Sequence, residues 1–235
     1  MPAESVWIDV EGKHACRLEG RWQTGDVHNG ARSDLVAVLC HPHPKLGGNM
    51  NCNVVTSMQD GLTRWGVSSL RFNFRGVGRS SGGKTWGGSH EAEDVHAAIA
   101  FAMAKGGSQR RVLLLGYSFG AAVSTSVAAT AELAGLVLVA PPWGWLSSMV
   151  LGKHQNSLPA LRERPLPVLA VIGDEDNYTS VSRFESKLDL IGRPVRRVVV
   201  PGVDHFFVGR ESAVVDAVVA WIHEEVAQGQ QKVYT

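Results

Sequence analysis

The pentapeptide Gly116–Gly120, Gly-Tyr-Ser-Phe-Gly, is the feature that most limits how this chain can fold. It follows the apolar run Arg111–Leu115 and precedes a stretch of small, helix-compatible residues, Ala121–Ala131. G-x-S-x-G between such segments predicts a strand, a sharp turn with serine at its apex, and a helix. The turn would strain the backbone of Ser118, and the flanking glycines would let strand and helix approach closely. A hydroxyl held there is placed to attack a carbonyl carbon.

The motif alone is weak evidence, because G-x-S-x-G arises by chance in many chains. The strand before it and the helix after it strengthen the interpretation. A serine hydroxyl is also a weak nucleophile at neutral pH. It needs a histidine to take its proton and a carboxylate to orient that histidine. The test is therefore whether an acid and a histidine follow Ser118 in the required order.

The rest of the chain alternates between apolar runs of strand length and helical patterns. Strands are expected at Val6–Val10, His14–Trp22, Leu35–Cys40, Val67–Phe74, Arg111–Leu115, Leu136–Val139, Pro167–Ile172 and Val195–Val200. Helices are expected at Asn53–Trp65, Glu91–Lys105, Ala121–Ala131, Thr179–Ile191 and Glu211–Ala227. Two opening antiparallel strands followed by repeated βα units predict an α/β fold, a mostly parallel sheet with helices on both faces. We expect a single domain over residues 1–235.

The composition of the chain limits which kinds of molecule the protein is expected to bind. The 235 residues include 23 basic and 22 acidic side chains, a formal net charge of +1, which argues against binding to nucleic acid or to an anionic membrane surface. The three cysteines, Cys16, Cys40 and Cys52, are too few for a disulfide framework and suit a reducing compartment. We see no secretory signal and no apolar run of membrane-spanning length, so the expected location is the cytoplasm. The sequence does not distinguish a monomer from a dimer.

The chain order required of the catalytic residues is present. Ser118 is followed by Asp176 and then by His205, and both later residues lie just beyond predicted strands. Asp174 is the competing acid, but a strand-end glycine followed three positions later by Asp favours Asp176. Asp204 directly precedes His205 and is interpreted as a turn-former.

An acyl-transfer reaction also needs donors for the oxyanion. One is expected to be the backbone N–H of Phe119, directly after the nucleophile. The other should come from the loop His41–Pro44, in which the prolines have no N–H and only His41 and His43 can donate. We choose His43, because it lies further past the strand and nearer the serine turn.

Three other features of the sequence give weaker predictions of a binding site. His41 and His43 alternate along an extended segment as metal ligands can, but no third ligand of suitable spacing follows, so no metal is expected. Gly76 and Gly78 do not extend to G-x-G-x-x-G, and no Walker sequence exists. Trp143 and Trp145 follow a strand and are candidates either to line a substrate pocket or to pack at the surface.

Several segments together resemble the α/β-hydrolase superfamily, and more narrowly a group of small hydrolases near the dienelactone hydrolase and serine peptidase branches. They are His41–Pro44 with Gly47–Gly48, Arg71–Gly78 with Ser80, Gly116–Ala121, Ala140–Pro142 and His205–Phe207. The resemblance implies a triad of Ser118, Asp176 and His205 and no cofactor. It does not imply a substrate. The segment after Pro142 is too short for a large lid, so we expect a minimal one. The chain departs from the pattern after Asp176, where apolar and proline residues often follow the acid.

The resulting hypothesis is a serine hydrolase that cleaves small carboxylic esters through an acyl-enzyme on Ser118. A serine peptidase or amidase would use the same residues. A binding protein that keeps the fold without turnover is the third alternative, although such a protein would not need all three side chains.

Overall fold

The computed structural model describes residues 3–27, 34–107, 111–144, 151, 154 and 156–226. Its strands are β1 (Glu4–Val10), β2 (Cys16–Gln23), β3 (Leu35–Cys40), β4 (Ser68–Phe72), β5 (Arg111–Tyr117), β6 (Gly135–Val139), β7 (Val168–Gly173) and β8 (Arg196–Val200). Its α-helices are α1 (Asn53–Arg64), α2 (Glu91–Gly106), α3 (Phe119–Ala128), α5 (Val181–Asp189) and α6 (Glu211–Trp221). Short turns of helix are η1 (Pro44–Leu46), η2 (Pro159–Leu161) and the π-helical η3 (Ile222–Val226).

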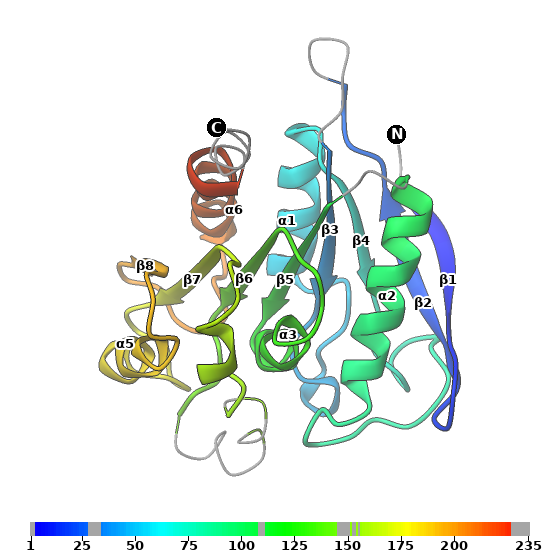
Figure 1. Cartoon of the computed structure of the whole chain (residues 1–235), viewed down its shortest axis with the longest axis horizontal. Coiled ribbons are helices and arrows are strands. Elements are labelled where there is room, and N and C mark those ends of the chain that lie inside the picture. Colours follow the sequence, from blue (N-terminus) through cyan, green and yellow to red (C-terminus); the bar gives the residue numbers. More distant parts are fainter. Residues whose placement is uncertain are drawn as a thin grey trace.

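The strands form one sheet in the order β1-β2-β4-β3-β5-β6-β7-β8 (Figure 1). The β1–β2 and β2–β4 pairs are antiparallel, and every later pair is parallel. This confirms the expected mostly parallel sheet with antiparallel N-terminal strands. The register sets Cys40 of β3 beside Gly116 of β5, so the loops that follow these strands leave the same edge of the sheet. In such sheets ligands bind at this edge.

Each face of the sheet carries its own apolar core. Val36, Val38 and Cys40 of β3 belong to the core shared with α2, α3 and α5. The alternate residues of the same strand belong to the core under α1 and α6 (Figure 1). Because the central strands are covered on both sides, they are continuous apolar runs rather than alternating ones.

Three boundaries close to Ser118 and His41 differ from the expected ones. Strand β4 ends at Phe72 instead of Phe74. The N–H of Asn73 still donates to Glu19 of β2, whereas the N–H of Phe74 donates to the ring of His41. Strand β5 continues to Tyr117 instead of Leu115, since its last residues still pair with β6. Helix α3 begins at Phe119, so the turn between strand and helix consists of Ser118 alone.

The connection from β6 to β7 is the place where a large lid would be inserted. Its described residues contribute the short helical turn η2 and place Leu158 and Leu161 in the core. Within the described ranges, no helix combines the length and apolar character needed to cross a bilayer.

Candidate active site

Ser118 sits at a strained turn between β5 and α3. Its backbone has φ 54° and ψ −116°, a region that residues with a side chain rarely adopt. A Cβ on Gly116 would lie 2.4 Å from the carbonyl oxygen of Gly120, and a Cβ on Gly120 would lie 2.3 Å from that of Cys40. Both positions therefore require glycine. Together they press the start of α3 against the ends of β5 and β3 and hold the serine between them.

The side chains of Ser118, His205 and Asp176 form one hydrogen-bonded row. The Nε2 atom of His205 lies 2.9 Å from the Oγ atom of Ser118, and its Nδ1 atom lies 2.7 Å from Oδ2 of Asp176. The side chains of His205 and Asp176 are 5% and 0% exposed. Because a carboxylate only accepts hydrogen bonds, the ring proton belongs on Nδ1, which leaves the Nε2 lone pair to receive the serine proton. The structure thus brings together the three residues that the sequence order predicts.

A tight turn fixes the carboxylate. Oδ1 of Asp176 accepts the backbone N–H groups of Tyr178 at 2.8 Å and Thr179 at 2.9 Å, which leaves Oδ2 for His205. Asp174 points elsewhere, since its Oδ1 accepts the N–H of Gly202 at 2.7 Å. The structure therefore places Asp176, and not Asp174, on the histidine, and Asp174 joins the two loops that carry the acid and the imidazole.

The backbone around His205 is also held in place. The hydroxyl of Tyr117, the residue before the serine, donates to the His205 carbonyl at 3.0 Å. Oδ1 of Asp204 accepts the N–H of Phe206 at 2.9 Å, the turn-forming contact predicted for that residue. Phe207 is fully buried at φ 54°, a further unfavourable conformation close to the site. Strained backbone is thus present both at the serine and two residues after His205.

The two predicted oxyanion donors lie on neighbouring segments. Phe119 opens α3, so its N–H is one of the four that the geometry of a helix leaves without an intrahelical acceptor. The rings of His43 and Phe119 are in contact, with centroids 4.6 Å apart. The His43 carbonyl accepts the N–H groups of Leu46 and Gly48, and its Nδ1 accepts that of Lys45. These bonds fold the loop after β3 back beside the start of α3.

Comparison with known proteins agrees with this geometry. A family model described as serine aminopeptidase, S33, matches residues 34–193, which include Ser118 and Asp176. The chain belongs to this family of hydrolases. Its resemblance to the α/β-hydrolase superfamily is thereby confirmed.

Similar proteins occur in several bacteria. Protein RP471 of Rickettsia prowazekii is 29% identical over 197 residues, covering 81% of this chain and 78% of that protein. An α/β serine hydrolase homologue from Coxiella burnetii is 32% identical, with a TM-score of 0.78 and coverage of 94% of this chain and 97% of that one. XC6422 from Xanthomonas campestris, described as an α/β serine hydrolase without a lid, is 28% identical, with a TM-score of 0.79 and coverage of 96% and 97%. The expected fold, with at most a minimal lid, is confirmed.

A second histidine of this hydrolase, His41, has a role that the sequence did not reveal. It is fully buried, its Nδ1 lies 2.6 Å from the Pro42 carbonyl oxygen, and its Nε2 accepts the N–H of Phe74 at 3.0 Å. Burial lowers the pKa of His41 to about 3, so the ring is neutral. It joins the loop after β3 to the loop after β4. The motif His-Pro-His-Pro marked this loop, but not which of its histidines turns inward.

Of the two tryptophans proposed as substrate contacts, the structure describes only Trp143. Trp143 is fully buried and stacks on Phe184 of α5, with centroids 5.9 Å apart, so its ring is part of the apolar core and not of the surface. The backbone N–H of Trp143 donates to Oγ1 of Thr179 at 2.8 Å, and its backbone carbonyl accepts from Nε of Arg183 at 2.7 Å. Its interactions thus tie the loop after β6 to the loop that carries the acid. Trp145 lies outside the described residues.

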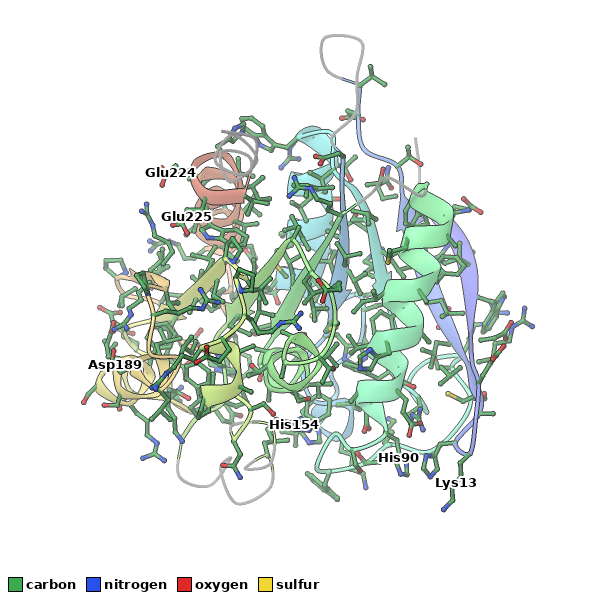
Figure 2. All side chains as sticks on the ribbon, in the orientation of Figure 1. Lys13, His90, His154, Asp189, Glu224 and Glu225 are labelled. Atoms are coloured by element: carbon green, nitrogen blue, oxygen red, sulfur yellow. The ribbon has the colours of Figure 1, made fainter. Side chains whose placement is uncertain are left out.

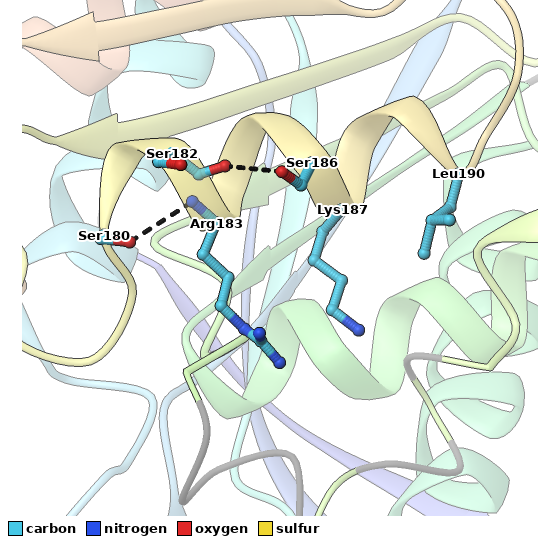
Figure 3. A pocket seen from close by; sticks show the side chains of 6 residues that line it. All are labelled: Ser180, Ser182, Arg183, Ser186, Lys187 and Leu190. Atoms are coloured by element: carbon cyan, nitrogen blue, oxygen red, sulfur yellow. Dashed lines mark hydrogen bonds between the residues drawn. The ribbon is translucent and has the colours of Figure 1, made fainter.

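An open hollow of about 510 Å³ runs along α5 (Figure 3). None of the three residues of the row lines it. Burial and the charge of Arg183 lower the pKa of Lys187, and the side chains of both extend from the same side of the helix. The residues that line the hollow are Ser180, Ser182, Arg183, Ser186, Lys187 and Leu190.

The loop after β4, which the sequence marks by its polar residues, is structural. Arg75 is buried and pairs with the fully buried Asp94 of α2, its Nη2 lying 2.6 Å from Oδ1. Asp94 also accepts the backbone N–H of Arg75, at 2.9 Å. The hydroxyl of Ser80 donates to the Asn73 carbonyl at 2.8 Å. This loop therefore braces the site without supplying a group to the row of Ser118, His205 and Asp176.

Two further histidines have structural partners. His154, labelled in Figure 2, is buried between the hydroxyl of Ser126 at 2.8 Å and the carbonyl oxygen of Gly87 at 2.7 Å. His90, also labelled there, stacks on His14 with centroids 3.8 Å apart. Neither has the pairing of carboxylate and hydroxyl that surrounds His205. In the part of the chain that the structure describes, no group of three or more His, Cys, Asp or Glu side chains is arranged to hold a metal ion.

Proposed function

We propose that this hydrolase cleaves small carboxylic esters through an acyl-enzyme on Ser118. The observation that carries the proposal is the row of 2.9 Å and 2.7 Å contacts that joins Ser118 to His205 and His205 to Asp176. A buried imidazole with a carboxylate on one nitrogen and a hydroxyl on the other is suited to moving a proton.

The reaction proceeds in two halves. Oγ of Ser118 attacks the acyl carbon while Nε2 of His205 takes its proton, and Asp176 stabilises the imidazolium that forms. The N–H groups of Phe119 and His43 hold the negative oxygen of the tetrahedral intermediate. His205 then donates the proton to the leaving alcohol. Water then attacks the acyl carbon and loses a proton to His205. The bond from that carbon to Oγ of Ser118 breaks, His205 returns the proton to Oγ, and the carboxylic acid leaves.

All the groups in these steps are side chains, backbone N–H groups or water, so the proposal calls for no cofactor. Preorganisation supports it, because Asp176, His205 and Ser118 are each fixed by backbone contacts before a substrate arrives. Removing one donor of such an oxyanion site costs about 10²- to 10³-fold in kcat in a related chemistry. Proton transfer through His205 would supply most of the rate enhancement that the oxyanion donors do not supply.

A peptidase or amidase is the second candidate, and the description of the matching family favours considering it. We prefer the ester because peptide selection on this fold would call for further binding elements, and the described residues form little beyond the sheet and its helices.

Labelling with a fluorophosphonate probe tests whether the serine is activated. We expect the wild-type protein to be labelled and the Ser118→Ala variant not to be. Folded wild-type protein that takes no label would instead support a binding protein without turnover. A panel of p-nitrophenyl esters of rising chain length, set against peptide anilides, separates the two enzymatic candidates. Faster cleavage of the anilides would overturn the esterase proposal.

A further inference from the structure

Two exposed aromatic rings flank the buried imidazole. The ring centroids of Tyr178 and Phe206 lie 4.3 Å and 5.6 Å from that of His205, and 6.4 Å from each other. Tyr178 is 42% exposed and Phe206 is 48% exposed, whereas His205 is 4% exposed. Single exposed aromatic residues are common on protein surfaces, but two that touch the same buried imidazole form an apolar surface at the point where the proton is transferred.

The backbone of each ring is anchored by the contacts that build the site. The N–H of Tyr178 donates to the same Asp176 carboxylate that orients His205. The N–H of Phe206 donates to Asp204, and its carbonyl accepts the side-chain amide of Asn53 at 2.9 Å. The backbone positions of the two rings are therefore set in advance, and a bound group would not have to pay for ordering a loop.

The proposed mechanism fixes which part of a substrate meets these rings. The oxyanion points towards Phe119 and His43, while the leaving oxygen must lie within hydrogen-bonding distance of Nε2 of His205, because that atom protonates it. The carbon attached to the leaving oxygen therefore lies on the side of the imidazole. The aromatic surface beside His205 is thus placed to meet the alcohol portion of an ester rather than its acyl portion.

We propose that Tyr178 and Phe206 form the subsite for the alcohol portion, and that this subsite favours esters of alcohols carrying an aromatic ring. The inference rests on the proposed esterase function. Offset or edge-to-face contact between rings contributes beyond the burial of apolar area. The rings select the alcohol and take no part in the proton transfer, so they determine specificity rather than chemistry.

The same subsite gives the enzyme a second reaction. After the first alcohol leaves, an aromatic alcohol can occupy the subsite in place of water. His205 takes the proton of its hydroxyl, the alcohol oxygen bonds to the acyl carbon, the bond from that carbon to Oγ of Ser118 breaks, and the proton passes to Oγ. The product is a new ester, and neither an oxidant nor a further reactant is consumed. Acyl transfer to arylmethanols is therefore expected to compete with hydrolysis.

Butyrate esters of benzyl alcohol and of ethanol test the subsite, since they share one acyl group. The measured quantity is the ratio of kcat/KM for the two esters, and comparing variants cancels the intrinsic reactivity of each alcohol. We expect Tyr178→Ala and Phe206→Ala each to lower the benzyl-to-ethyl ratio about fivefold, as one ring contact is lost. Tyr178→Phe keeps the ring and should keep the ratio.

Two control variants remove exposed tryptophans whose ring contacts are with histidines other than His205. Trp65 is 51% exposed and packs on His223, and Trp86 is 54% exposed and packs on the His43 side of the site. The ratio should stay within about twofold of wild type in Trp65→Ala and in Trp86→Ala, because neither ring lies beside the leaving oxygen. An equal fall of the ratio in these variants would contradict the proposal.

Acyl transfer gives an independent measurement. With butyryl-enzyme formed from one common donor ester, we expect benzyl alcohol to capture a larger share of the acyl group than ethanol at equal concentration. The preference should fall in Tyr178→Ala and persist in Tyr178→Phe, which keeps the ring. Fluorophosphonate labelling with unchanged ratios and no preference in transfer would refute the subsite and leave the esterase proposal standing. Absence of labelling and of turnover would refute both.

Discussion

Two buried histidines stand at the same edge of the sheet with opposite surroundings. His41 follows β3, is 0% exposed, and contacts a backbone carbonyl and a backbone N–H. His205 follows β8, is 4% exposed, and contacts a carboxylate and a hydroxyl. Burial is therefore nearly equal in the two regions. What differs is whether the neighbours carry a charge or an exchangeable proton.

That difference separates a structural histidine from one that can move protons. Burial among neutral groups disfavours the charged form of an imidazole, and it lowers the pKa of His41 to about 3. His41 can thus only hold two loops together. At His205 the carboxylate of Asp176 orients the ring, and the hydroxyl of Ser118 supplies a proton to accept. The comparison predicts that variants in the two regions will fail in different ways.

The largest effect is expected from exchanging the two imidazoles for amides. His205→Gln should lower kcat/KM for an ester by about 10⁵-fold, because no base then takes the serine proton. His41→Gln should lower it by less than about 100-fold, through movement of the oxyanion loop alone. Steady-state kinetics on one p-nitrophenyl ester measures both variants. A greater loss of activity in His41→Gln would invert the assignment of roles.

The two acids of the loop after β7 sharpen the comparison further. Asp176→Asn should lower kcat by about 10⁴-fold, since an amide in place of the carboxylate favours the wrong tautomer of the histidine. Asp174→Asn should change kcat by less than about tenfold, because Asp174 contacts only backbone N–H groups. Equal losses in the two variants would mean that the carboxylates share the role assigned to Asp176.

Strand order and strand ends made much of the fold and site predictable. Ser118, Asp176 and His205 each follow an apolar run, and parallel strands end at one edge, so their meeting follows from the placement of the runs. The spacing from Gly173 also favoured Asp176 over Asp174, and the structure places Asp176 on the imidazole. Apolar runs and the polar residues that directly follow them can be read from short stretches of sequence, so these parts of the site were predictable.

Features that depend on packing between distant segments were not accessible in the same way. Trp143 was a candidate for substrate contact, but its ring is buried against Phe184, about 40 positions later in the chain. The inward turn of His41 depends on the N–H of Phe74, which β4 leaves unpaired because that strand ends at Phe72. No local pattern encodes such partners. Sequence reasoning therefore found the residues of the row more readily than those that hold it in place.

The pH dependence of stability tests the neutral state of His41. Its pKa is about 3 in the folded protein, against an ordinary value of 6.5, so the unfolded chain binds the proton more readily. The free energy of unfolding should therefore fall as the pH drops from about 6.5 towards 3. Between pH 7 and pH 5, urea unfolding should show wild type losing about 2 kcal/mol more than His41→Gln. Equal losses of unfolding free energy in the two proteins would show that His41 takes up a proton in the folded protein between pH 7 and pH 5.

The smallest effect is expected where a backbone contact, and not a side chain of the row, is removed. Tyr117→Phe deletes the hydroxyl that donates to the His205 carbonyl at 3.0 Å but keeps the buried ring. The variant should lose about 1 kcal/mol of unfolding free energy, the net worth of one hydrogen bond, and its kcat should fall only a few-fold. The carboxylate of Asp176 and the hydroxyl of Ser118 still hold the imidazole. Urea unfolding and ester kinetics on the same preparation measure the two effects. A fall in kcat as large as that of Asp176→Asn would mean that the backbone of the loop, rather than the carboxylate, sets the position of His205.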